Sequence, residues 1–201
     1  MNGFFAELKE QRWDDHRYYH NSRINQTLHL ISAMSFVATY ALLFVHPVFA
    51  VLFGWTFSMC SRQIGHFFFE PKGYDERNQA THEYKESVKV GYNLRRKVIL
   101  HSIWGAVPVV LFFAPTLFGI FKQPWTDASG YADHLARVWL VLAGGALVFR
   151  TVHLFFIRSV KTGLAWFTKI LTDPFHDIYL YHKAPMYLLR GELIAPAHHG
   201  A

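Results

Sequence analysis

The chain has 201 residues, 52% of them apolar and 17% aromatic, and a formal net charge of +6. This apolar share is higher than a soluble domain of this length needs, yet the mean hydropathy is only +0.11, so the apolar residues must be gathered in blocks between polar connectors. The single cysteine, Cys60, excludes an intramolecular disulfide and a cysteine-based metal cluster. The composition favours a small polytopic membrane protein, and its thirteen histidines are the unusual feature.

Four apolar blocks predict four transmembrane helices, and they lie at about residues 27–45, 48–69, 98–121 and 136–157. A helix needs about 20 residues to cross the hydrocarbon core, and each block is near that length. Only His46 and Pro47 separate the first two blocks, so we expect a tight antiparallel hairpin; one buried core helix broken by the proline is the competing interpretation. The chain is thus predicted to be all-α, a single membrane domain over residues 1–201 with an up-down bundle of four spans.

The segment after the fourth block, at about residues 158–172, predicts an amphipathic helix that lies at the membrane surface. Its apolar face carries Val160, Leu164, Phe167 and Leu171. The lysines of this segment lie on other faces, as expected of an interfacial helix. An ordinary soluble helix packed on the connector at residues 70–97 is the alternative.

The twenty lysines and arginines fall mostly on one side of the predicted bundle. Four precede the first block, eight lie between residues 62 and 97, and six lie from Arg150 onward, while only Lys122 and Arg137 fall on the other side. By the positive-inside rule, both termini and the 70–97 connector face the cytoplasm, which predicts an integral protein of the bacterial inner membrane. The net charge then reflects topology and anionic lipid head groups, and it requires no nucleic acid partner.

Histidines within the predicted spans all lie near the cytoplasmic edge, and they are His29, His66, His101 and His153. Ionisable groups cost about 2.5–3.5 kcal/mol near the centre of a spanning helix and by default mark a functional site. For any one of them, a place at a helix end or in the membrane interface is an equally good explanation, but the shared layer predicts a metal site. Asn25 lies four residues before the first of them and Glu70 four residues after the second, so both histidines have a candidate hydrogen-bond partner one turn away.

Two motifs carry a family resemblance. His20, Asn25 and His29 form H-x4-N-x3-H in YYHNSRINQTLH, and residues 65–70 form G-H-x-x-F-E in GHFFFE. Over residues 18–70, the pair resembles the motifs of the small membrane family of 2-hydroxy fatty acid dioxygenases of fatty-acid α-oxidation. The resemblance implies an Fe(II)-dependent enzyme that uses O2 to shorten a 2-hydroxy fatty acid by one carbon. The chain departs from the family by lacking the Pro-Ala that follows the second motif and by adding the third and fourth blocks.

The expected metal ligands are histidines, because non-haem Fe(II) chemistry uses imidazoles and leaves positions open for O2 and substrate. The resemblance makes the motif histidines the first choice, and the other two spanning histidines come next. In that order, the expected ligands are His20, His29, His66, His101 and His153.

Other polar residues complete the expected site. Glu70 is expected as a further ligand or as an orienting residue, Asn25 as an orienting residue, and Arg62 as a binder of the substrate carboxylate. Arg95 or Arg96 is the alternative carboxylate binder, although the basic run that contains them also suits a topology anchor. The expected substrate is a lipid or fatty acid in the membrane.

Three other functions stay open at this point. A di-iron membrane hydroxylase or desaturase also places histidines on the cytoplasmic face of four helices, but such enzymes carry paired histidines, and the sequence has only the pair His198-His199. A b-type haem electron-transfer protein would use two histidines of one layer as axial ligands. A non-catalytic membrane protein would keep its histidines in the interface.

Overall fold

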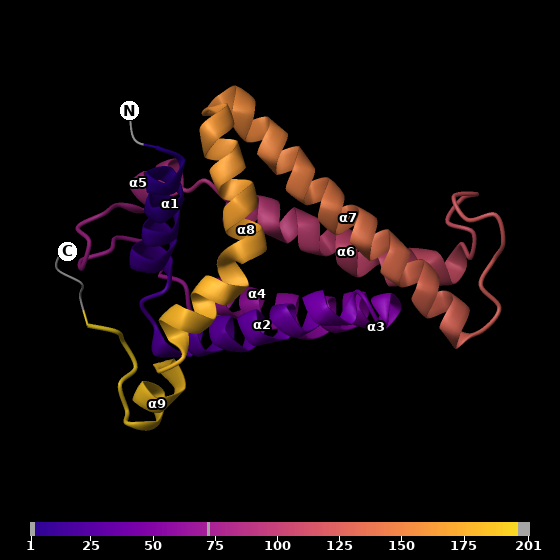
Figure 1. The fold of residues 1–201 in the computed structure, drawn as a ribbon, viewed down its shortest axis with the longest axis horizontal. Helices are drawn as coiled ribbons and strands as arrows, with labels where there is room; N and C mark the ends of the chain where they lie inside the picture. The colour runs from indigo at the N-terminus through magenta and orange to yellow at the C-terminus, as the bar shows by residue number, and fades with distance from the viewer. Residues whose placement is uncertain (1–2, 72, 197–201) are drawn as a thin grey trace.

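The computed structural model describes residues 3–71 and 73–196, which fold into helices joined by loops, without a β-strand among them (Figure 1). The all-α prediction is therefore confirmed. The pair His198-His199 lies outside the described residues.

The N-terminal part of the chain consists of the polar helix α1 (Phe4–Tyr19) and the first half of the predicted hairpin, α2 (Arg23–Leu42). Ser22 caps α2, because its hydroxyl accepts a hydrogen bond from the backbone N–H of Asn25. This cap starts α2 four residues before the predicted span at 27–45. The first turns of α2 consequently carry polar side chains.

The second predicted span is one helical run in three parts, α3 (Pro47–Phe53), η1 (Gly54–Met59) and α4 (Cys60–Phe68). All three parts contact α2, so the predicted antiparallel hairpin is present, and His46 stands at its turn as the residue before α3. The middle part, η1, is π-helical. A π-helical turn widens the helix locally and is frequent at functional sites.

Small residues allow the two arms of the hairpin to approach closely. A Cβ atom at Gly54 would lie only 2.9 Å from Thr39 Cγ2, and a Cβ at Gly65 would lie only 2.3 Å from Asn25 Oδ1. Between these two positions, Ser32 is buried and its hydroxyl donates to a backbone carbonyl of η1 at 2.7 Å. The contact between the arms therefore depends on glycine at both positions.

The connector contains the short helix α5 (His82–Val88), and the last two apolar blocks form α6 (Leu94–Phe113) and α7 (Ala128–Ile157). Helix α6 ends well before the predicted residue 121, because the residue preceding Pro115 disfavours helical backbone. Helix α7 begins before the predicted residue 136, because the Asp127 carboxylate caps its first turn.

Among the described residues, α6 and α7 are the two helices long and apolar enough to cross a membrane. Only 17% of the most apolar stretch of each is buried inside the protein, whereas the core helix of a soluble protein would be mostly buried. The first two predicted spans differ, since α2 opens with polar side chains and η1 divides the second run. A bundle of four spans therefore stays a prediction.

An aromatic core joins the hairpin to these two helices. Trp104 of α6 and Trp139 of α7 are buried, and the indole N–H of Trp139 donates to the backbone carbonyl of Trp104 at 3.2 Å. The ring of Trp55 from η1 lies 4.4 Å from that of Trp104, measured between ring centroids. This packing fixes α6 and α7 against the hairpin.

The predicted surface helix is longer than expected, because α8 (Val160–Tyr181) continues beyond residue 172. It packs against α1, α2 and α7, and in Figure 1 it crosses from the end of α7 to α2. Three residues of its predicted apolar face, Val160, Leu164 and Leu171, are exposed. The side of α8 that contacts the protein is instead rich in polar residues, which suits a helix whose apolar side faces lipid.

The C-terminal part returns to the α1–α2 turn. After α9 (Ala184–Leu189), the carbonyl of Leu193 accepts from the backbone N–H of Arg23, and the N–H of Ala195 donates to the carbonyl of Asn21, both at 2.9 Å. Helices α1, α8 and α9 thus gather at one end of the hairpin, and the loop between α6 and α7 lies at the opposite end (Figure 1).

Candidate metal centre

Three histidines from three different helical segments meet at the end of the hairpin. His20 directly follows α1, His29 lies in the second turn of α2, and His66 lies near the end of α4. Each offers a ring nitrogen, and the three nitrogens all lie within 4.8 Å of one another. The ring centroids are 4.0 Å apart for the first and second of these histidines, and 4.8 Å apart for the second and third.

Several nitrogens of this cluster are buried without a hydrogen-bond partner. They are Nε2 of His20, both ring nitrogens of His29, and Nδ1 of His66. The two Nδ1 atoms among them face carboxylate oxygens at 3.7 and 3.5 Å, so Nε2 of His20 and Nε2 of His29 are the nitrogens that call for a missing partner, because buried polar atoms are normally satisfied. A metal ion is the partner that suits several imidazole nitrogens at once.

The protonation state of the cluster also suits a metal. Burial lowers the pKa of the His20 imidazole well below its usual range, and the neighbouring His29 ring adds to this effect. His20 is therefore neutral at physiological pH. Neutral imidazole is the form of histidine that binds metal ions, because the ligating nitrogen needs its lone pair.

Each of the three histidines has an oxygen atom near its Nδ1. The hydroxyl of Tyr181 lies 2.9 Å from Nδ1 of His20. The other two oxygens belong to carboxylates: Asp177 Oδ2 lies 3.7 Å from Nδ1 of His29, and Glu70 Oε1 lies 3.5 Å from Nδ1 of the His66 ring. The expected place of Glu70 beside His66 is therefore what the structure shows.

Asn25 supports the site through the backbone instead of orienting His29. Its side-chain amide donates to the carbonyl of Tyr19 at 2.9 Å, and the amide of the next residue, Gln26, donates to the carbonyl of His20 at 2.8 Å. Both residues are buried, and together they hold the turn that carries His20. Asn25 lies four residues before His29, and this spacing predicted a contact between the two side chains. The Asn25 amide instead satisfies the Tyr19 carbonyl, which has no helical partner where the chain turns from α1 to α2.

Arg62, the expected binder of the substrate carboxylate, contacts carboxylates of the protein itself. Its guanidinium donates to Asp177 Oδ2 at 3.0 Å and lies 3.9 Å from Asp173 Oδ2. Since two carboxylates of the protein already face it, this placement favours holding Asp177 in position over binding a substrate carboxylate. The alternative carboxylate binders, Arg95 and Arg96, are exposed at the start of α6.

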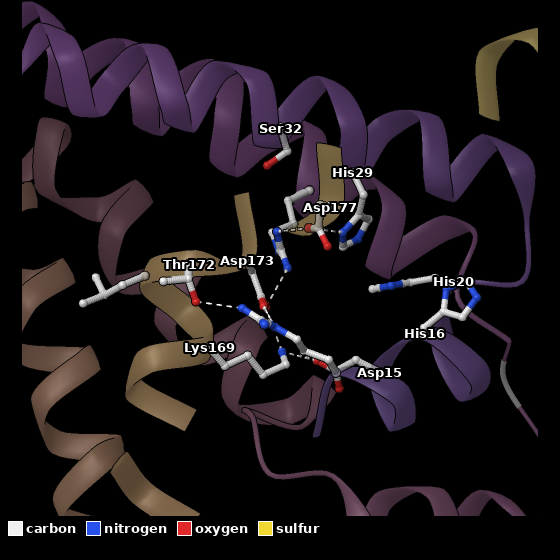
Figure 2. A network of polar contacts seen from close by, with 12 residues as sticks. Asp15, His16, His20, His29, Ser32, Lys169, Thr172, Asp173 and Asp177 are labelled. Atoms are coloured by element: carbon white, nitrogen blue, oxygen red, sulfur yellow. Dashed lines mark hydrogen bonds and ion pairs between the residues drawn. The ribbon is translucent and has the colours of Figure 1, made fainter. Parts of the chain in front are cut away.

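A polar stripe on α8 forms one wall of the site, and sequence analysis missed it. Residues at intervals of four along the helix are all buried, and they are Lys169, Asp173, Asp177 and Tyr181. Figure 2 shows the aspartates between the His29 side and the pair formed by Lys169 and Asp15. The two aspartates in TDPFHDIYLY are four residues apart, so they lie on one face of a helix and could have indicated the stripe. The prediction for this segment used only its apolar positions and therefore did not include them.

His101 and His153 lie outside the histidine cluster, so the predicted layer of four histidines is divided. Nδ1 of His101 lies 2.6 Å from the backbone carbonyl of Lys97, and its ring stacks on Trp55. Nδ1 of His153 faces the guanidinium of Arg150 at 3.0 Å. These contacts arise because both rings lie one turn from a residue of their own helix that satisfies them.

Comparison with known proteins adds no relative: no protein-family model, curated protein or solved structure matches the chain. The interpretation of the site therefore depends on its geometry and on the two motifs.

Proposed function

We propose that the chain is a membrane-embedded iron-dependent oxygenase in which His20, His29 and His66 bind one Fe(II) ion. The observation that carries this proposal is the convergence of their ring nitrogens within 4.8 Å, several of them buried and without a partner. A set of three protein ligands leaves coordination positions open, as catalytic metal sites do.

The identity of the metal comes from the motifs. Three neutral imidazoles also suit zinc, so the donor set alone does not select iron. The resemblance of H-x4-N-x3-H and G-H-x-x-F-E to the 2-hydroxy fatty acid dioxygenases favours Fe(II), and two of the three ligands are the first and last residues of the first motif, His20 and His29. When bound, the iron would supply O2 activation.

The proposed reaction converts a 2-hydroxy fatty acid and O2 into the fatty acid one carbon shorter, CO2 and water. These atoms and electrons balance with O2 as the only oxidant, so the reaction requires no electron donor. The residues of the chain hold the metal and keep bulk water away, since His20 and His29 are almost fully buried. The exposed apolar surfaces of α6 and α7 support a position in the bilayer, where the acyl chain of the proposed substrate would lie.

We also propose that all four apolar runs cross the membrane and that the metal centre lies on the cytoplasmic side of a bacterial inner membrane. The basic residues are concentrated at the end of the molecule that carries the site, as the positive-inside rule requires of that side. Accessibility of single cysteines introduced at exposed positions near residues 76 and 118 to a membrane-impermeant reagent tests this orientation.

The first test of the function is the metal content and the visible spectrum of the detergent-purified protein. About one iron per chain and no Soret band are expected, followed by release of the shortened acid from a 2-hydroxy fatty acid under O2. A Soret band would indicate the haem protein, and two irons per chain would indicate the di-iron hydroxylase. No bound metal after anaerobic reconstitution with Fe(II) would refute the proposal and favour a non-catalytic membrane protein.

A further inference from the structure

The wall of the site that α8 provides lies outside the region of the family resemblance, which ends at residue 70. Two consecutive members of its polar stripe, Asp177 and Tyr181, each face Nδ1 of a different histidine of the cluster. We propose that these two residues are positioning residues that fix the proton of His29 and of His20 on Nδ1, so that both rings present Nε2 to the metal. This inference rests on the proposed metal site.

The argument for His29 follows from the chemistry of the carboxylate. The Asp177 oxygen that faces His29 is Oδ2, which also accepts from the Arg62 guanidinium at 3.0 Å, so it acts as an acceptor and the ring nitrogen that faces it must carry the proton. The Nδ1–Oδ2 distance of 3.7 Å is slightly longer than a hydrogen bond. This hydrogen bond from Arg62 holds the Asp177 carboxylate in place. The remaining nitrogen, Nε2 of His29, is buried with an unshared lone pair and no partner.

The argument for His20 follows from the single proton of a phenol. The Tyr181 hydroxyl lies 2.9 Å from Nδ1 of His20 and 3.1 Å from Nδ1 of His16, so it can donate to only one of them and must accept from the other. If Tyr181 donated to His20, Nε2 of His20 would carry a proton that no acceptor meets in the interior. The other order, in which His20 donates and Tyr181 donates onward to His16, leaves Nε2 of His20 free for the metal.

The arrangement repeats at the third histidine, where Glu70 faces Nδ1 of His66 at 3.5 Å and is itself held by Lys89 at 3.2 Å. All three rings therefore have an oxygen at Nδ1. Two of these three oxygens come from α8, which makes α8 a part of the metal site and not only its cover. Outer partners of this kind typically change metal affinity about 10- to 100-fold when they are removed.

The test uses the purified full-length protein loaded with Co(II), a paramagnetic substitute for Fe(II) that reports on ring protons. A histidine bound through Nε2 keeps its Nδ1 proton, which gives an exchangeable, strongly shifted proton resonance. The unaltered protein is expected to show one such resonance for each of the three histidines. Tyr181→Phe and Asp177→Ala are each expected to lose or broaden one resonance through faster exchange with water, and to weaken Co(II) binding about 10- to 100-fold.

Matched substitutions separate positioning from stability. Thr172→Val also alters a polar residue of α8, but the Thr172 hydroxyl accepts from Arg12 and faces no histidine of the cluster. Tyr179→Phe alters an exposed tyrosine two residues before Tyr181. Both controls are expected to keep the three resonances and bind Co(II) within about threefold of the unaltered protein, even if Thr172→Val lowers the melting temperature of the metal-free protein. Asp177→Asn, which keeps an acceptor oxygen, is expected to recover much of the affinity that Asp177→Ala loses.

The outcomes distinguish the two proposals. If the unaltered protein binds metal but shows no exchangeable shifted resonances, or if Asp177→Ala and Tyr181→Phe bind Co(II) as tightly as their controls, the positioning role is wrong while the metal site stands. If the unaltered protein binds neither Co(II) nor Fe(II), both proposals are wrong.

Discussion

Gly65, the glycine of the second motif, is expected to be essential to the metal centre because of where its missing side chain would lie. A Cβ atom at this position would stand 2.3 Å from Asn25 Oδ1 and 3.3 Å from His29 Cδ2. Ordinary contacts of a Cβ begin at 3.4 Å, so Gly65→Ala requires the arms of the hairpin to separate by about 1 Å or Asn25 to rotate. Rotation would break the hydrogen bond from Asn25 to the Tyr19 carbonyl, which holds the turn carrying His20.

The expected magnitude follows from these contacts. Overpacking costs about 1–3 kcal/mol and a lost hydrogen bond about 1 kcal/mol, while alanine in a helix gains back about 1 kcal/mol over glycine. The net loss of about 1–3 kcal/mol corresponds to a melting temperature lower by roughly 2–12 °C for a chain of this length. Metal affinity should fall more than about tenfold, since displacing His29 and His66 by even about 0.5 Å spoils a ligand set.

The assay compares Gly65→Ala with Gly105→Ala, by thermal unfolding of the metal-free protein in detergent and by competition with a chelator for Fe(II). Gly105 also lies within a helix, but a Cβ there would meet nothing within 4 Å. The control should therefore keep its metal affinity and its melting temperature, or gain slightly in stability. A Gly65→Ala protein with the melting temperature and affinity of the unaltered chain would refute the close approach of α2 and α4 on which the site depends.

Further substitutions test the ligands and the charged wall. His66→Ala is expected to abolish Fe(II) binding while the helix content measured by circular dichroism stays unchanged; retained binding would remove His66 from the site. Glu70→Gln should weaken Fe(II) binding about 10- to 100-fold in the same chelator competition, and an unchanged affinity would make it a residue of the helix end only. Burial alone would raise the pKa of Asp15, but the Lys169 ammonium outweighs it and lowers the pKa to about 2. The pair therefore stabilises the fold fully above pH 4, and this contribution is lost as the pH falls toward 2. The melting temperature of Asp15→Asn should consequently change less between pH 5 and pH 2 than that of the unaltered protein. An equal change of melting temperature with pH in both proteins would contradict the pairing of Asp15 with Lys169.

Sequence analysis identified the residues whose roles are local. His29 and His66 were recognisable because histidine within an apolar helix is costly, His20 because it belongs to the first motif, and the partner of His66 because Glu70 follows it by four residues. Helix α7 begins earlier than predicted because the cap at Asp127, and not hydropathy, decides where it starts. Helix α8 continues past the predicted residue 172 to Tyr181, and its buried face there carries the polar residues Asp173 and Asp177, which an apolar pattern does not mark.

Contacts between segments far apart in the chain could not be predicted from the sequence. Asp177 and Arg62 face each other from helices 115 residues apart, and no periodicity in either segment indicates the other. His101 and His153 were predicted as ligands because they lie at the same level of the predicted bundle as His29 and His66. Rotation about the helix axis decides which way a ring points, and that rotation is set by the packing of α6 and α7 on the aromatic core.

The separation along the chain between the histidines and their partners on α8 has a consequence for biosynthesis. The Tyr181 hydroxyl reaches His20 across 161 residues, and the C-terminal segment closes over the same turn through Leu193 and Ala195. A ribosome delivers α1 and the hairpin to the membrane long before α8 emerges. During that interval the three imidazoles have neither their α8 oxygens nor their buried surroundings, so the proposed metal site is complete only after translation has passed α8, and metal loading is expected at that final stage of maturation.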